Sequence, residues 1–232
     1  MQCVTKQGNL GCARAEPLSH LFQCAAALAL TVTIMVLPAV LHGQSVPAIK
    51  FSPPTFYSGF NTFTTCGYSF NVNSPAGVSI THLSMFDAGS NGLALAHAVG
   101  LWNSAGTLLA SATVPIGTSA ALDASGQFRF VDIPDITLPQ GTGYAVGGLM
   151  IPGSDGSASE WTNLIVAPGI TYGQPRFLDN NISTPTFPSS VGFGTSGYVG
   201  GSFLVAPIPE PMNVAMAAIV AVPMLCRRSR VG

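Results

Sequence analysis

Residues 46–206 consist of short apolar runs that are divided, every few residues, by Gly, Pro, Asn and Ser. Runs of this length are typical of β-strands, and the residues between them are typical of turns. No stretch in this range repeats its apolar side chains with the 3.6-residue period of an amphipathic helix. The pattern predicts an all-β fold of about ten short strands, an antiparallel β-sandwich or jelly roll.

The composition of the chain agrees with this prediction. Its 232 residues include 26 Gly and 18 Pro, and only 7% are charged, against about 25% in a typical globular domain. A chain of this kind is poor in helix formers and rich in turn formers.

The clearest strand patterns lie in the first half of this range. Residues 67–72 alternate between apolar and polar side chains, which predicts a half-buried strand. Residues 99–102 and 107–114 are β-like runs on either side of a polar turn at 103–106. This arrangement predicts a β-hairpin.

The pattern is less regular further along the chain. Residues 127–131 alternate, and we expect Phe128 and Phe130 on the opposite face of a strand from Arg129. From residue 153 onward the strand pattern weakens, and only short runs such as 176–178 resemble strands.

The first 44 residues predict a secretory signal peptide with an extended leader. Leu21–Leu41 is a nearly unbroken apolar stretch, and Lys6 and Arg14 precede it, as in export signals. We expect cleavage between Ala39 and Ser45. The alternative is an uncleaved membrane anchor, because the apolar run is close to a membrane-spanning length.

The last 26 residues, 207–232, contain three elements in a fixed order. The first is Pro209-Glu210-Pro211, and the second is an uncharged apolar run, Met212–Cys226. The third is a basic cluster made of Arg227, Arg228 and Arg230. As a helix the run would span roughly 22 Å, less than the ~30 Å of a bilayer core. This order predicts a short transmembrane helix with its basic end on the cytoplasmic side.

This tail resembles the PEP-CTERM sorting signal of bacterial exosortase substrates. The resemblance implies that a membrane-bound exosortase is a partner and that it cleaves beside the Pro-Glu-Pro motif. It also implies an exported protein of the cell envelope, the cell surface or the extracellular matrix of a biofilm. The domain layout would be a signal peptide at 1–44, a β-domain at 45–206 and the sorting signal at 207–232. An ordinary C-terminal membrane tail is the alternative.

Part of the central region resembles secreted β-sandwich domains of the DUF4082 type. The residues that carry the resemblance are Gly67–Phe70, Val99–Trp102, Gly106–Ala112 and Leu138–Tyr144. The resemblance implies a fold and a secreted role, and it brings no catalytic residues.

The sequence offers little for metal binding. Four of the five cysteines lie in the two terminal segments, which leaves only Cys66 in the domain and excludes a disulfide there. Residues 87–92 form an oxygen-rich loop in which Asp87 and Asn91 could hold a calcium ion, although a turn stabilised by its own side chains is the alternative. We expect no other metal and no cofactor.

Catalytic residues are also scarce. The domain contains only His82 and His97 as histidine bases, and it lacks a GxSxG motif. The nearby pair Asp132 and Asp135 fits a turn better than a glycosidase site. A GxGxxG match at 192–197 precedes a strand-like run rather than the helix that a dinucleotide site needs. We expect a non-enzymatic protein, with a secreted hydrolase as the less favoured alternative.

Aromatic side chains give a further alternative, a secreted carbohydrate-binding module. The five candidates for sugar stacking are Trp102, Trp161, Tyr57, Tyr172 and Tyr198. Trp161 stands beside Glu160 in a weak loop segment and is the preferred stacking candidate, although a residue at the rim that covers the core is the favoured interpretation. Between residues 45 and 207, three basic residues face seven acidic ones, a net charge of −4 with histidine neutral. Nucleic acid is therefore not an expected partner, whereas extracellular polysaccharide is.

Overall fold

A computed structural model describes residues 45–52, 55–192 and 197–206. This part of the chain is all-β, and its strands pair antiparallel. The strands are β1 (Val46–Pro47), β2 (Ile49–Lys50), β3 (Thr55–Tyr57), β4 (Thr64–Val72), β5 (Val78–Phe86), β6 (His97–Trp102), β7 (Leu108–Val114), β8 (Ala121–Leu122), β9 (Phe128–Leu138), β10 (Gly141–Met150), β11 (Ser157–Ser159), β12 (Ile165–Val166), β13 (Ile170–Asp179), β14 (Ser190–Val191) and β15 (Gly201–Ala206).

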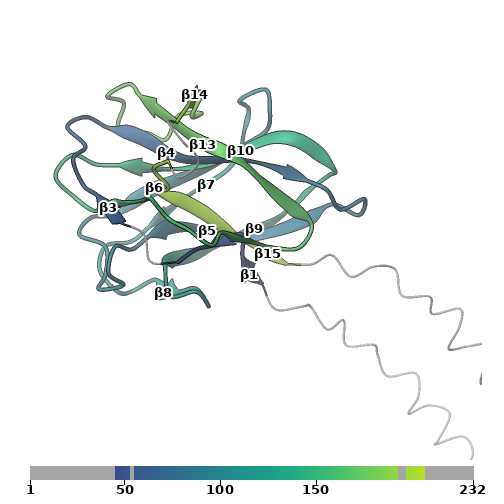
Figure 1. The fold of residues 1–232 in the computed structure, drawn as a ribbon, viewed down its shortest axis with the longest axis horizontal. Coiled ribbons are helices and arrows are strands. Elements are labelled where there is room, and N and C mark those ends of the chain that lie inside the picture. The colour runs from purple at the N-terminus through teal and green to yellow at the C-terminus, as the bar shows by residue number, and fades with distance from the viewer. Residues whose placement is uncertain (1–44, 53–54, 193–196, 207–232) are drawn as a thin grey trace, which may run out of the picture. The chain divides into compact units, whose positions relative to one another are not determined.

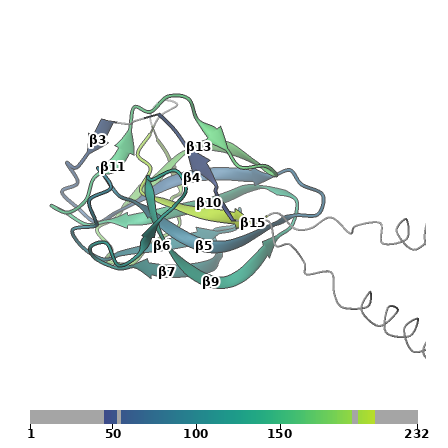
Figure 2. The ribbon, with the colours of Figure 1, turned by 90° about the horizontal axis from the view of Figure 1, so that it is seen from below.

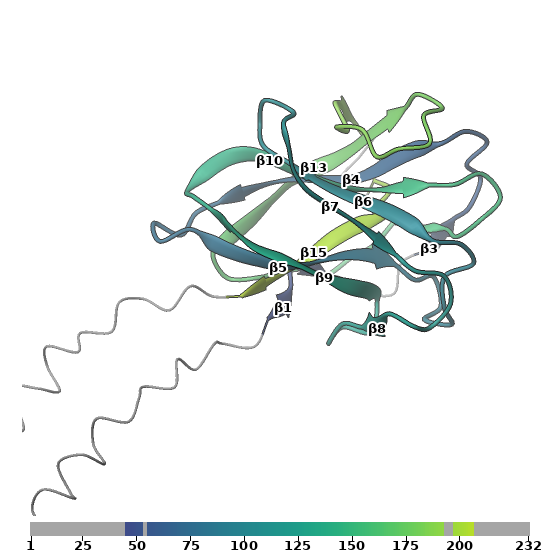
Figure 3. The same ribbon diagram turned by 180° about the vertical axis from the view of Figure 1, so that it is seen from behind.

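Two large sheets account for most of these strands (Figure 1). One has the order β1-β15-β5-β9-β8 and the other the order β14-β13-β4-β10-β6-β7. Figure 3 shows them as two stacked layers, with the six-stranded sheet above the five-stranded one. Two short pairs, β11 with β3 and β12 with β2, complete the structure.

Aromatic side chains from both sheets meet in the core. Phe70 of β4 packs against Phe203 of β15, with ring centroids 4.7 Å apart. Tyr68, also on β4, is fully buried and shares a 2.9 Å hydrogen bond between its hydroxyl and that of Ser202 on β15. Apolar burial of this kind is the main force that holds two sheets together.

Glycines allow the two sheets to approach very closely at one point. A Cβ added to Gly201 of β15 would lie 2.3 Å from the amide nitrogen of Gly148 on β10, in the other sheet. A Cβ added to Gly148 would in turn lie 2.5 Å from the sulfur of Met85. Only residues without a side chain fit at this crossing.

The strand pairing gives the domain two distinct ends. Val46 pairs with Val205, so the described chain starts and finishes side by side at one end, which we call the terminal end. The small β3–β11 pair lies at the other end, because Ala158 of β11 bridges to Val199, just before β15 begins. Figure 2 shows β3 and β11 opposite the tip of β15. We call this the far end.

The structure confirms the predicted all-β class and the predicted hairpin. β6 and β7 pair antiparallel around the turn at 103–106, where the amide of Gly106 donates to the carbonyl oxygen of Asn103. The strand predicted at 67–72 is also present, as part of β4.

Two strand predictions differ from the structure. β13 runs from Ile170 to Asp179, well beyond the predicted 176–178, and a register shift between Tyr172 and Pro175 carries it past a glycine and a proline. Residues 67–72 were predicted to be half-buried, but both faces of β4 are buried there, with only Asn71 partly exposed. Arg129 lies on the opposite face of β9 from Phe128, as predicted, and it is buried beside Met85 of β5, its partner in the register.

The predicted signal helix and the predicted transmembrane helix lie outside the described residues. Among the residues that the structure does describe, there is no helix with the length and apolar character needed to cross a membrane.

Candidate functional site

The sorting motif and its basic cluster lie outside the described residues. Pro209, Glu210 and Pro211 belong to this set, as do Arg227, Arg228 and Arg230. The structure therefore bears only on the candidate sites of the β-domain.

The loop proposed for calcium, residues 87–92, supplies the acidic partner of a buried ion pair. Asp87 lies at the end of β5 with a fully buried side chain, and its Oδ2 accepts a 2.6 Å hydrogen bond from Nε of Arg129 on β9. The backbone amide of Gly92 also donates to the Asp87 carboxylate. Arg129 further donates to the carbonyl oxygens of Ala120 and Ser90.

This geometry favours the turn interpretation of residues 87–92. The guanidinium and an amide already occupy the Asp87 carboxylate, while the side chain of Asn91 is exposed. Gly89 and Ser90 adopt positive φ angles of 85° and 57°, as expected of a tight turn. Within the described ranges, no group of three or more His, Cys, Asp or Glu side chains converges as a metal site would require.

Each histidine of the domain forms a pair with an aspartate. His97 is buried, with Nδ1 2.7 Å from the carbonyl oxygen of Leu149 and Nε2 2.9 Å from Oδ2 of Asp155. His82 lies 2.6 Å from Asp132, whose side chain is 91% exposed. Both ring nitrogens of His97 are thus engaged, and a nucleophile would have to displace one of these contacts to reach the ring. The contact of His97 ties the segment around Asp155 to β6, whereas His82 and Asp132 are partners in the paired strands β5 and β9. Asp132 and Asp135 thus lie within β9 and not in the predicted turn.

Cys66 lacks the features of a nucleophilic cysteine. Its side chain is fully buried in β4. Burial, with a smaller effect from the negative charge of Asp179, raises the pKa of the thiol far above its ordinary value. The reactive form of cysteine is the thiolate, which this environment disfavours.

The burial of three titratable side chains predicts that the folded domain loses stability at alkaline pH. It raises the pKa values of Tyr68 and Tyr172 as well as that of Cys66. Above the ordinary values of 9.0 for Cys and 10.0 for Tyr, the unfolded chain releases protons that the folded chain keeps. Stability is therefore complete below about pH 9 and falls as the pH rises, by about 1.4 kcal/mol per pH unit for each group. Urea unfolding of the full-length protein between pH 8 and pH 11 measures this slope.

The Tyr68→Phe variant is the matched control for that measurement. It keeps the ring in the core and removes one titrating group, so its stability is expected to fall less steeply above pH 10. A free energy of unfolding that stays constant from pH 8 to pH 11 would contradict the prediction.

Trp161 is packed in the interior, which fits a residue that covers the core better than one that stacks on a sugar. Only 8% of Trp161 is exposed. Its ring stacks on Phe51, with centroids 5.4 Å apart, and meets Tyr172 edge-on at 5.5 Å. Trp102 is buried too. Of the five aromatic candidates, the structure leaves Tyr57 and Tyr198 as the exposed ones, each at 38%.

Tyr57 and Tyr198 lie together at the far end. Their ring centroids are 4.5 Å apart, and Phe60 contacts both rings edge-on. β3 carries Tyr57, and Tyr198 immediately precedes the bridge between Val199 and Ala158 of β11. Two segments remote in the sequence thus place aromatic rings side by side, which explains why sequence patterns alone did not single out this pair.

Two hollows flank this pair of tyrosines. We call the first the aromatic cleft; it has a volume of about 470 Å³ and is lined by Thr55, Phe56, Tyr57, Ser159, Glu160, Gly197 and Tyr198. The second hollow has a volume of about 290 Å³ and is lined by Tyr57, Gly59, Phe60, Asn61, Thr62, Thr64, Cys66, Phe177, Asp179 and Tyr198. Both have exposed rings next to polar groups, the composition typical of small-molecule sites.

Glu160 is held in an unusual backbone conformation at the edge of the aromatic cleft. Its φ angle is 49°, a left-handed value that is uncommon for residues other than glycine. The hydroxyl of Thr55 lies 3.2 Å from Oε2 of Glu160 and 3.0 Å from the Ser159 hydroxyl. Strained backbone of this kind clusters at functional sites.

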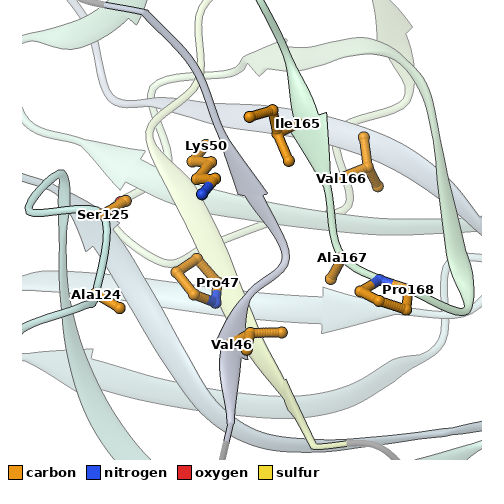
Figure 4. A pocket seen from close by; sticks show the side chains of 9 residues that line it. All are labelled: Val46, Pro47, Lys50, Ala124, Ser125, Ile165, Val166, Ala167 and Pro168. Atoms are coloured by element: carbon orange, nitrogen blue, oxygen red, sulfur yellow. The ribbon is translucent and has the colours of Figure 1, made fainter.

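A third pocket is apolar and is lined by residues of β1, β2, the β12 segment and the loop after β8. Its volume is about 250 Å³, and Figure 4 shows its lining of Val46, Pro47, Lys50, Ala124, Ser125, Ile165, Val166, Ala167 and Pro168. Of the described residues in this lining, Lys50 alone is charged. The pocket offers few polar groups that could orient a ligand.

Comparison of the chain with protein-family models, with curated proteins and with solved structures found no match.

Proposed function

We propose that this chain is an exported, non-enzymatic protein of the bacterial cell envelope, sorted by an exosortase through its C-terminal tail. The observation that carries the proposal is the order of elements in that tail. Pro-Glu-Pro at 209–211 precedes an uncharged apolar run, and a cluster of three arginines follows it. The apolar leader at the other end of the chain supports export. The mature protein would act at the cell surface or in the extracellular matrix.

The ends of the β-domain are compatible with this role. Val46 and Val205 are paired, so the leader and the tail join the domain at the same end. A chain held in a membrane by its tail would therefore keep the far end free. We infer that the two sheets form an antiparallel β-sandwich, a fold common in secreted domains, because Phe70 and Tyr68 of one sheet pack against β15 of the other.

The described side chains support a non-enzymatic role. Leu149 and Asp155 engage both nitrogens of His97, and Arg129 engages Asp87. Cys66 is buried and has a raised pKa. Neither histidine of the domain lines the aromatic cleft or the second hollow. Hydrolysis by a nucleophile and base would need such groups to meet in a cleft.

The intact mass of the protein tests the sorting proposal. In the natural host we expect a mature form that has lost both the leader and the residues after the Pro-Glu-Pro motif. In a host strain without its exosortase, we expect the C-terminal residues to remain. A Glu210→Ala variant should also retain them if the enzyme recognises this motif.

The two strains separate the possible outcomes. Additional mass on the new C-terminus would show that the protein is attached to an envelope molecule. A chain that still ends at Gly232 in both strains would overturn the sorting proposal and leave an ordinary membrane-tethered β-domain.

A further inference from the structure

We propose that the far end of the domain binds neutral polysaccharide, with the paired rings of Tyr57 and Tyr198 as the stacking platform. This inference goes beyond the sorting proposal and does not depend on it, because it rests only on described residues of the β-domain.

The first support is the exposure of the rings. Tyr57 and Tyr198 are each 38% exposed and Phe56 is 54% exposed, whereas both tryptophans of the domain are buried. Exposed aromatic groups that gather at one place usually mark a binding surface. A pyranose ring has an apolar C–H face that can lie on a tyrosine ring, while its hydroxyls stay at the edge and form hydrogen bonds.

The second support is the set of polar groups around the rings. Glu160 borders the aromatic cleft, and Asp179 borders the second hollow. Carboxylate oxygens accept hydrogen bonds and therefore suit sugar hydroxyls, which can donate them. Thr55 contacts Glu160, and the hydroxyl of Thr62 donates to Asp179. These contacts orient the two carboxylates before any ligand arrives, which lowers the entropic cost of binding.

The charge of the lining indicates which polysaccharides would fit. Among the described residues that line the two hollows there is no Lys, Arg or His, and each hollow has one carboxylate. A uronate or sulfate group would meet a negative charge without a cation to offset its desolvation. The lining therefore favours uncharged sugars over anionic ones.

The shared wall of the two hollows favours a polymer over a single sugar. Tyr57 and Tyr198 line both hollows, so one sugar chain could cross the platform and occupy both sides. Their volumes of about 470 and 290 Å³ are within or near the ~300–1,000 Å³ that is usual for ligand sites.

Affinity electrophoresis of the full-length protein in detergent tests this proposal. The gels would contain a neutral β-glucan, a glucomannan, a galactomannan or the anionic polymer alginate. We expect at least one neutral polymer to retard the protein and alginate to have no such effect. Tyr198→Ala should weaken binding by about fivefold, since the loss of one aromatic contact is worth roughly 1 kcal/mol.

Two control variants make the result specific. Tyr198→Phe keeps the ring and should bind within about twofold of the unchanged protein. Leu108→Ala removes another exposed apolar side chain, on β7 beside Trp102, and should not affect binding. The proposal is overturned if no neutral polymer retards the protein, if alginate retards it equally, or if a folded Tyr198→Ala variant binds as well as the unchanged protein. Sorting plays no part in these gels, so their outcome is independent of the exosortase experiment.

Discussion

Replacing Arg129 with alanine is expected to lower the free energy of unfolding by about 3–5 kcal/mol. The guanidinium is the charge partner of Asp87, whose side chain is fully buried. Without it, a carboxylate would remain in the interior with only the amide of Gly92 as a donor. The variant also removes the hydrogen bond to the carbonyl oxygen of Ala120, which ties the β8 segment to β9. Urea unfolding followed by tryptophan fluorescence measures the change.

The matched control is Asp132→Asn. This substitution removes the acidic partner of a contact of the same length, 2.6 Å, but the Asp132 side chain is 91% exposed. Water solvates the Asp132 carboxylate, so we expect little change in stability. The double variant Asp87→Asn with Arg129→Met should be more stable than Arg129→Ala alone, because it leaves no buried charge. Equal stability of Arg129→Ala and the unchanged protein would show that the pair does not hold the far-end loops.

Gly201→Ala is expected to destabilise the protein by about 3 kcal/mol or more. The added methyl group would lie 2.3 Å from the nitrogen of Gly148 and 2.4 Å from the carbonyl carbon of Gly147. Both are backbone atoms of the facing sheet, so no rotamer change can relieve the clash. The sheets would have to separate locally, which would open the packing around Met85 and Phe203. The midpoint of thermal unfolding reports the loss.

Gly141→Ala provides the comparison for this variant. Gly141 lies at the start of β10, and the nearest atoms to an added Cβ belong to the Tyr144 ring, at 3.3 Å. The Tyr144 ring can shift slightly to make room for the methyl group, so the loss in free energy of unfolding should stay below about 1 kcal/mol. If the two glycine variants unfold at the same temperature, the sheets are not closely apposed at Gly201.

The Asp87–Arg129 pair and the close approach of the sheets at Gly201 also bear on the proposed polysaccharide site. Gly201 is the first residue of β15, and Tyr198 lies just before it. The close crossing of the sheets thus fixes the position from which Tyr198 meets Tyr57. Arg129 joins the 87–92 loop to the residue before β8 at the same end. We therefore expect the platform to be rigid, as sites built on strand ends generally are.

Local sequence patterns determined the class of the fold. The alternation at 67–72 and the polar turn at 103–106 predicted a strand and a hairpin, and both are present. Such features depend on neighbouring residues, whose side chains alternate across a strand and whose turn residues tolerate tight conformations. The same reasoning missed most of β13, because Gly173 and Pro175 interrupt the pattern and a bulge accommodates them.

Only the tertiary structure decided which side chains are buried and which meet. Arg129 lies on the opposite face of β9 from Phe128, as the alternation predicts, yet it is buried, and Asp87 is its charge partner. Trp161 was the preferred stacking residue, but Phe51 and Tyr172 enclose it. Tyr57 and Tyr198 are neighbours solely because β3 pairs with β11, which in turn bridges to Val199. In an antiparallel fold, contacts of this kind join segments remote in sequence, and a pattern read along one strand carries no record of its partners.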